Sequence, residues 1–218
     1  MPRPTDNLES IAERARLSFD ARDSVREKVL PLCREVIRHS SKTTRSVHRQ
    51  EFEQARNLLE SAGTVLNEAS KLIVEYDEFR YSGFYRDAQK EYTEAAVTLA
   101  LVSDKRIPAP EELGTDFAAY LNGLGEAAGE VRRFILDGIR REDLSRGEDL
   151  LEAMDDIYSI LVSMDFPEAI TAGLRRTTDM VRGVLERTRS DLTLVMKQNR
   201  LEEKLGPSRY NLKKKQDN

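Results

Sequence analysis

The sequence of 218 residues contains no tryptophan, two histidines and a single cysteine, Cys33. One cysteine cannot form an internal disulfide, which favours a reducing compartment, and the apolar neighbours of Cys33 predict a small core side chain. Two histidines without companion cysteines exclude a zinc site of the usual kind. No apolar run is long enough to span a bilayer, and the N-terminus has no apolar signal segment. We therefore expect a cytoplasmic protein with no membrane partner.

Charge, in contrast, is abundant: charged residues form 34% of the chain and hydrophobic residues 39%. Long segments rich in Ala, Glu, Leu, Lys and Arg show no strand-like alternation, which predicts an all-α protein, and the length suits one domain. The formal net charge is -4 and the pI is near 5.5, which argues against a broadly basic surface for nucleic acid. The distribution of the basic residues therefore matters more than their total.

Capping residues and prolines predict the first helix boundaries. Thr5 or Asp6 can cap a first helix, and Pro31 is expected to break or kink that helix before it resumes. Prolines in the loop 105–114 are expected to exclude helix there, which makes this loop the clearest break in the chain.

The remaining boundaries lie after this loop. Thr115 or Asp116 is expected to begin the next helix, and a Gly-Pro stop signal at Gly206 is expected to end the last one. The residues beyond that signal, 207–218, form a polar, lysine-bearing tail that we expect to be disordered.

One row of basic side chains follows Pro31. Its members are spaced four, four, three and four residues apart, so on a helix they share one face, and only one acid lies in the same segment. At about 1.5 Å of rise per residue the row is roughly 22 Å long, which suits the backbone of a few nucleotides. The simpler interpretation is the solvated face of a long charged helix. We call this row the basic stripe: Arg34, Arg38, Lys42, Arg45 and Arg49.

Two glutamates, Glu91 and Glu94, stand directly ahead of an apolar run in a predicted helix over residues 83–104. Helical spacing places both on a face with small and apolar residues such as Thr98, so that face should be at least partly buried. A carboxylate that leaves water needs a cation or a metal ion as partner, or else takes up a proton. The pair is therefore a candidate for chemistry.

A second pair of acids, Glu126 and Glu130, follows on the next predicted helix. Each interior glycine costs a helix about 1 kcal/mol relative to alanine, and the close approach of another helix is the usual reason for one. The expected neighbour is the segment that carries the first two glutamates. The glycines concerned are Gly123, Gly125 and Gly129.

Two helices that face each other with these acids would gather four carboxylates at one point. Such oxygen ligands suit Mg2+ or Mn2+, which can activate water against a phosphodiester. In an alternative without nucleic acid, the chain is a helical scaffold whose acids pair with local arginines such as Arg86, Arg132 or Arg133.

Two segments resemble the most characteristic motifs of the translin family, above all of its Trax branch. The string EYTEA from residue 91 is similar to the family pattern EYVEA, and YLNGLGEAAGEVRR from residue 120 is similar to YLxGxxDxxGELxR. In this resemblance Glu91, Glu94 and Glu130 stand at acids of the family's catalytic cluster. Glu126 stands where Trax has an aspartate, so the carboxylate is kept but one more methylene moves its oxygens.

The segment 34–49 is similar, without a gap, to the family pattern RDITxxSKRxxFLLHR. Arg38 and Arg45 do not match this pattern. The resemblance extends from about residue 20 to about residue 204. The matching residues of the segment are Arg34, Lys42, His48 and Arg49.

The resemblance implies an elongated bundle of about seven helices over residues 1–206, assembled into a hollow oligomer, commonly of eight subunits, or with a second translin-family subunit. It implies an endoribonuclease dependent on Mg2+ or Mn2+ that encloses single-stranded RNA, with single-stranded DNA left open as a ligand. The alternative is a translin-like protein that binds single strands without cutting them. The implied catalytic and metal-binding residues are Glu91, Glu94, Glu126 and Glu130. The implied nucleic-acid-binding residues are Arg34, Arg38, Lys42, Arg45, His48, Arg49 and Arg133.

Overall fold

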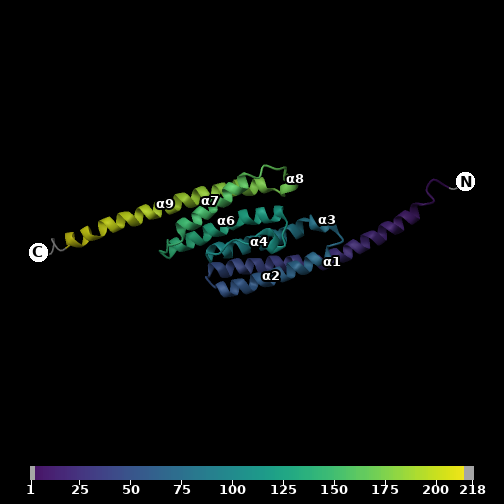
Figure 1. Cartoon of the computed structure of the whole chain (residues 1–218), viewed down its shortest axis with the longest axis horizontal. Coiled ribbons are helices and arrows are strands. Elements are labelled where there is room, and N and C mark those ends of the chain that lie inside the picture. The colour runs from purple at the N-terminus through teal and green to yellow at the C-terminus, as the bar shows by residue number, and fades with distance from the viewer. Residues whose placement is uncertain (1–2, 214–218) are drawn as a thin grey trace. The chain divides into compact units, whose positions relative to one another are not determined.

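The computed structural model describes the backbone of residues 3–213 and the side chains of residues 3–205. Within these residues all regular structure is α-helical, which confirms the predicted fold class, and α3, α5 and α8 are single turns (Figure 1). The helices are α1 (Leu8–His48), α2 (Phe52–Leu72), α3 (Asp77–Arg80), α4 (Gly83–Val102), α5 (Pro110–Leu113), α6 (Phe117–Arg140), α7 (Gly147–Val162), α8 (Glu168–Thr171) and α9 (Leu174–Lys213).

The helices belong to two compact units, residues 1–124 and residues 125–218. The boundary falls within α6, so this helix begins in the first unit and ends in the second. The expectation of a single domain over residues 1–206 stays a prediction.

The first unit is built around α1, α2 and α4, which lie side by side (Figure 1). Apolar residues recur at intervals of three and four along each of these helices, so one stripe per helix can be buried. The core that results includes small alanines on α2 and α4, which let the helix axes approach closely, together with larger side chains such as Leu66 and Tyr85. Its buried members include Val29, Cys33, Val36, Ala62, Leu66, Ala69, Tyr85 and Ala88.

Helix α1 is continuous through Pro31, so the predicted break is wrong, whereas a kink at this residue stays a prediction. A proline inside a helix costs about 3 kcal/mol. Val29 and Val36, on either side of Pro31, are fully buried in the same core, and burial of each contributes about 1.5–3 kcal/mol. Packing on both sides of the proline therefore outweighs its local cost. The cap is also displaced from the predicted positions, because the helix begins after Asn7.

The connection between α4 and α6 is ordered by polar contacts. Pro110 begins the single turn α5, so the prediction that this loop contains no helix is wrong; proline is tolerated at the first position of a helix, where its missing N–H is not needed. The Glu112 carboxylate accepts hydrogen bonds from Arg106 at 2.7 Å and from the Ala109 N–H at 2.7 Å. Asp116 then accepts from the Ala119 N–H at 2.9 Å, which confirms it as the start signal of α6.

In the second unit, α7 packs on α9 through a buried apolar stripe. Arg132 of α6 connects to α9 by donating to the Thr188 hydroxyl at 3.0 Å and to the Asp191 carboxylate at 2.9 Å. Helix α9 continues to Lys213, past the stop predicted at Gly206, and residues 214–218 of the predicted tail lie outside the described residues. The stripe on α7 consists of Leu150, Leu151, Met154, Ile157 and Leu161.

No described helix combines the length and the apolar character that a membrane crossing requires.

The side chain of Cys33 is 1% exposed, as predicted for a core residue, and burial raises the pKa of its thiol to about 11. The thiol therefore stays protonated near neutral pH and is a weak nucleophile. The cytoplasmic location stays a prediction.

Candidate functional site

The first two candidate acids, Glu91 and Glu94, project from adjacent turns of α4 and are both partly buried. The residues that share their face continue into the core, since Ala95 and Thr98 are fully buried. The predicted partial burial of this face is therefore confirmed. The position matters chemically, because a carboxylate at the edge of a core is less hydrated and binds a cation more strongly than one in open water.

Helix α6 approaches α4 at Gly123. A Cβ atom added to this glycine would lie 2.5 Å from the carbonyl oxygen of Lys90 and 2.7 Å from the Cβ of Thr93. No larger residue fits without displacing the backbone of α4. The predicted close approach is confirmed at this glycine, and Lys90 and Thr93 flank Glu91 in the sequence.

Glu126 follows Gly123 by one helical turn on the same continuous helix, at the level of the acids of α4. One carboxylate oxygen from each of Glu91, Glu94 and Glu126 lies within 4.8 Å of the others. All three residues are partly buried, and each also makes other polar contacts in the protein. Three carboxylate oxygens at this spacing fit the ligand preference of Mg2+ or Mn2+. We call these three residues the acidic cluster.

Glu130 does not belong to the acidic cluster, although the sequence predicts four converging acids. It lies four residues beyond Glu126, which is about 6 Å further along the axis of α6. Its carboxylate is 3.7 Å from the guanidinium of Arg133, which is exposed.

The local arginines of the scaffold alternative are engaged in different ways. The guanidinium of Arg86 lies over the ring of Tyr81 at 5.3 Å. Arg132 pairs with Asp191 of α9 at 2.9 Å. Arg133 forms an ion pair with Glu130, one of the predicted site residues. The scaffold alternative therefore gains support at Glu130.

Gly125 and Gly129, the other two glycines for which the approach to α4 was predicted, do not serve it. Gly125 faces the opposite direction, about 200° around the helix from Gly123, and an added Cβ there would lie 3.2 Å from Leu161 of α7 and 3.4 Å from Val181 of α9. An added Cβ at Gly129 would have no neighbour within 4 Å among the described residues. The expectation that one neighbouring helix explains all three glycines is therefore wrong.

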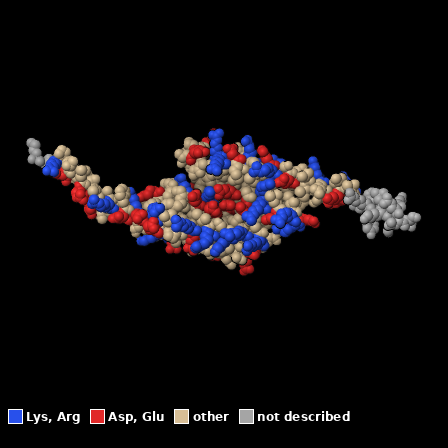
Figure 2. Space-filling view, turned by 180° about the vertical axis from the view of Figure 1, so that it is seen from behind, with Lys and Arg blue, Asp and Glu red and all other residues tan. Residues whose placement is uncertain are grey.

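The basic stripe is present as predicted, since all five of its residues are exposed on α1 and at its C-cap. The opposite side of the same helix segment is buried, with Val36 and Val47 fully inaccessible. Arg38 pairs with Glu35 at 3.3 Å, and Arg45 donates to the carbonyl oxygen of Ser41 at 3.2 Å. Figure 2 shows a row of Lys and Arg side chains on this face, near a patch of Asp and Glu side chains.

His48, near the end of the basic stripe, is half-buried and makes polar contacts within the protein. Its partial burial distinguishes His48 from the five members of the basic stripe, which are exposed. The part of His48 in binding nucleic acid stays a prediction, as does that of Arg133.

Comparison with known proteins found no matching family model. The uncharacterized protein MJ0175 of Methanocaldococcus jannaschii is 31% identical over 191 residues, which cover 84% of this chain and 82% of that protein. Among solved structures, the crystal structure of AfC3PO has a TM-score of 0.79 and 33% identity, over 87% of this chain and 98% of that chain. A complex of AfC3PO with duplex RNA has a TM-score of 0.78 and 32% identity over the same shares.

The structure of apo-NeC3PO is also similar, with a TM-score of 0.72 over 89% of this chain and 98% of that chain. Its identity of 19% shows a common fold and nothing further. The likeness to AfC3PO is closer, because about a third of the residues are identical along nearly all of that chain. The EYTEA and GEV motifs, the all-α fold and this likeness agree, and the chain belongs to the translin family.

Proposed function

We propose that this protein is a metal-dependent endoribonuclease that acts on single-stranded RNA. The observation that carries the proposal is the acidic cluster, in which oxygens of Glu91, Glu94 and Glu126 lie within 4.8 Å of one another. The existence of an AfC3PO complex with duplex RNA supports RNA as the ligand class. Mg2+ or Mn2+ held by the cluster would supply Lewis acidity at a phosphodiester.

The acidic residues near this site are proposed to have different roles in the reaction. Glu91 and Glu94 lie one turn apart on α4, and Glu126 completes a three-oxygen set from α6. Their partial burial limits competition by bulk water for the same oxygens. Glu130, the fourth predicted acid, lies next to the cluster and holds Arg133 at 3.7 Å, where this guanidinium can meet a phosphate.

The basic stripe is proposed to bind the phosphates of the RNA backbone. Its cations are exposed and are carried by the same unit as the two acids of α4. Neutralising phosphates releases counterions, so affinity should fall steeply as the salt concentration rises. Because contacts to phosphates do not depend on the base sequence and are also possible with DNA, single-stranded DNA is a further ligand to be tested.

Assembly with other copies, or with a second translin-family subunit, is also part of the proposal. Leu8, Ile11 and Phe19 of α1 are 56%, 43% and 63% exposed, yet they lie on the same side of the helix as the buried Val29 and Cys33. Among the described residues, no element of the same unit covers this face. An apolar face of this kind supports assembly with another subunit, and the number of subunits, commonly eight, is what the family resemblance implies.

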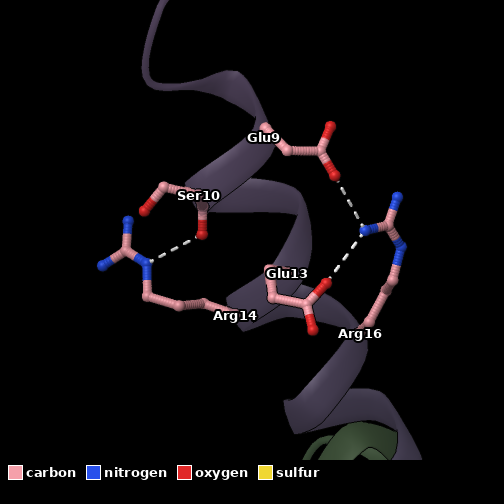
Figure 3. A network of polar contacts seen from close by, with 5 residues as sticks. All are labelled: Glu9, Ser10, Glu13, Arg14 and Arg16. Atoms are coloured by element: carbon pink, nitrogen blue, oxygen red, sulfur yellow. Dashed lines mark hydrogen bonds and ion pairs between the residues drawn. The ribbon is translucent and has the colours of Figure 1, made fainter.

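A charged network flanks the apolar face of this segment. Arg16 contacts Glu9 at 3.2 Å and Glu13 at 3.1 Å, and Arg14 donates to the carbonyl oxygen of Ser10 at 3.3 Å (Figure 3). These pairs support the helix locally, because residues three and four apart are neighbours on its surface. The exposed segment is thus held as a helix that can present its apolar face.

The second candidate function is a translin-like protein that binds single strands without cutting them. The specific observation in its favour is Glu126 at the position where the Trax pattern has aspartate. One extra methylene changes where the oxygens lie, and a metal ion tolerates little error in ligand position. The presence of Glu126 in the acidic cluster favours the nuclease over this alternative.

The experiment that tests the proposal is cleavage of a short, end-labelled single-stranded RNA by the purified protein. Reactions contain Mg2+, Mn2+ or EDTA, and the Glu94→Gln variant is assayed in parallel. Glu60→Gln, an exposed acid of α2, is the matched control. We expect cleavage by the wild type and the control, and its loss with EDTA and in Glu94→Gln while RNA binding persists. Binding without cleavage in every metal would establish the non-catalytic alternative.

A further inference from the structure

A pocket with a volume of about 370 Å3 lies in the first unit, between the end of α2, α3, the first half of α4 and the residues that precede α6. This volume is in the range of small-molecule sites. The pocket is separate from the acidic cluster, because Gln89, which lines it, is rotated by about 200° around α4 from Glu91. Neither the basic stripe nor the acidic cluster contributes a residue to its wall.

Two residues that line this pocket, Gln89 and Thr115, each have a buried side-chain polar atom without a hydrogen-bond partner among the described residues. Gln89 is 4% exposed, and its Nε2 donates to the carbonyl oxygen of Gly114 at 3.3 Å, whereas its Oε1 is unpaired. The Oγ1 of Thr115 is also buried and unpaired. An acceptor withdrawn from water without a donor is unfavourable, so each of these atoms calls for an N–H or O–H group.

The pocket also contains charges of both signs. Arg80 of α3 and Asp116, just before α6, line it together with Tyr85 of α4. Burial raises the pKa of the Tyr85 phenol to about 12, and among the nearby charges Arg80 lowers it while Asp116 raises it. The cation and the anion therefore both lie near this hydroxyl. The phenol stays protonated at neutral pH and can donate a hydrogen bond.

We propose that this pocket binds a small molecule that carries an amino group and an anionic group. The amino group donates to two or three of the acceptors Gln89 Oε1, Thr115 Oγ1 and the Asp116 carboxylate, according to its number of N–H bonds, and the anionic group pairs with Arg80. A nucleoside monophosphate with an exocyclic amino group and a free α-amino acid both have this chemistry. The volume of the pocket admits either source.

The test uses the full chain and pairs of probes that differ by the amino group. One arm compares adenosine monophosphate with inosine monophosphate, and the other compares leucine with 4-methylpentanoate. Inorganic phosphate serves as an anion without an amino group. Isothermal titration calorimetry should show saturable binding in one arm, and removal of the amino group should weaken it about tenfold or more, as expected when a buried acceptor is left unpaired. The arm that binds identifies the source of the ligand.

Two variants locate the binding. Arg80→Gln should weaken the same ligand about tenfold, because it removes the charge that faces the anionic group, and Arg26→Gln on the exposed surface of α1 is its matched control. Gln89→Met should reduce the preference for the amino group, because one of its acceptors is lost. Because Gln89 also donates a hydrogen bond to Gly114, the fold of Gln89→Met is checked by circular dichroism and by its melting temperature. If Gln89→Met unfolds, the binding measured with Arg80→Gln tests the proposal.

Three results would overturn the proposal. The first is the absence of binding by every probe, and the second is equal binding of the members of each pair. The third is unchanged binding by Arg80→Gln. None of these results depends on ribonuclease activity, so the experiment tests this inference independently of the proposed function.

Discussion

Gly123 and Gly129 lie two turns apart on α6, and the surroundings of these two glycines differ. An added Cβ at Gly123 would lie 2.5 Å from the carbonyl oxygen of Lys90, whereas one at Gly129 would have no neighbour within 4 Å. Both positions carry the same helical cost in the sequence. An interior glycine therefore indicates a close approach only where a facing element exists, and the glycine itself does not reveal which position has one.

The largest expected effect comes from filling the packed position. In Gly123→Ala the new methyl group must displace the backbone of α4 at Lys90, which should lower the free energy of unfolding by about 1–3 kcal/mol. Urea denaturation followed by circular dichroism measures this change. Stability equal to that of the wild type would show that α4 and α6 are not in close contact at this glycine. The same variant should also weaken Mn2+ binding, because the displacement separates Glu126 from the acids of α4.

Filling the open position should have the opposite sign. Gly129→Ala adds a methyl group that meets nothing and improves helix propensity, so the free energy of unfolding should rise by about 1 kcal/mol. The same urea titration detects the increase, with Gly123→Ala as the reference for a blocked position. A loss of stability in Gly129→Ala would reveal a neighbour that approaches this glycine in solution.

A smaller effect is expected on the exposed face of α1, where the comparison concerns charge and not packing. In Lys42→Gln the basic stripe loses one cation, so the slope of log affinity for single-stranded RNA against log salt should become shallower by about 0.7. Fluorescence anisotropy between 50 mM and 200 mM salt, the range over which such affinities change strongly, measures the slope. Lys71→Gln on α2 is the control. An equal salt-dependence slope in Lys42→Gln and Lys71→Gln would show that Lys42 does not contact the RNA.

The smallest expected effect concerns the loop that leads into the packed end of α6. Hydrogen bonds from Arg106 and from the Ala109 N–H lower the pKa of the Glu112 carboxyl from 4.5 to about 2. Because the folded pKa is the lower one, this contribution to stability is present above pH 4.5 and is lost as the pH falls through 2. Comparing Glu112→Gln with the wild type should show a stability difference that shrinks over this range. A difference independent of pH would indicate that the ion pair is not formed in solution.

Much of the candidate site could be predicted from local patterns. The spacing of Glu91 and Glu94 placed both on one partly buried face of α4, and Asp116 was identified as the start of α6. The basic stripe was predicted residue by residue, because exposure on a long helix follows from its period of 3.6 residues. These features depend on residues within one or two turns of each other.

Other features could not be predicted, because they depend on elements distant in the sequence. Gly125 packs against Leu161 of α7 and Val181 of α9, which follow it by 36 and 56 residues. Pro31 remains within α1 because Val29 and Val36 are buried against α2 and α4. The unpaired acceptor of Gln89 becomes visible only once Gly114 has taken the amide donor of this side chain.

By itself the sequence determined the helical class, the acids of α4 and α6 and the basic face of α1, because helix periodicity is a property of the local backbone. Only the tertiary structure decided that Glu126 joins Glu91 and Glu94 while Glu130 does not, and that Gly123 is enclosed while Gly129 is open. The physical reason is that burial and close packing act between segments far apart in the chain. The free energies of burial and packing exceed the cost of placing a proline or a glycine inside a helix.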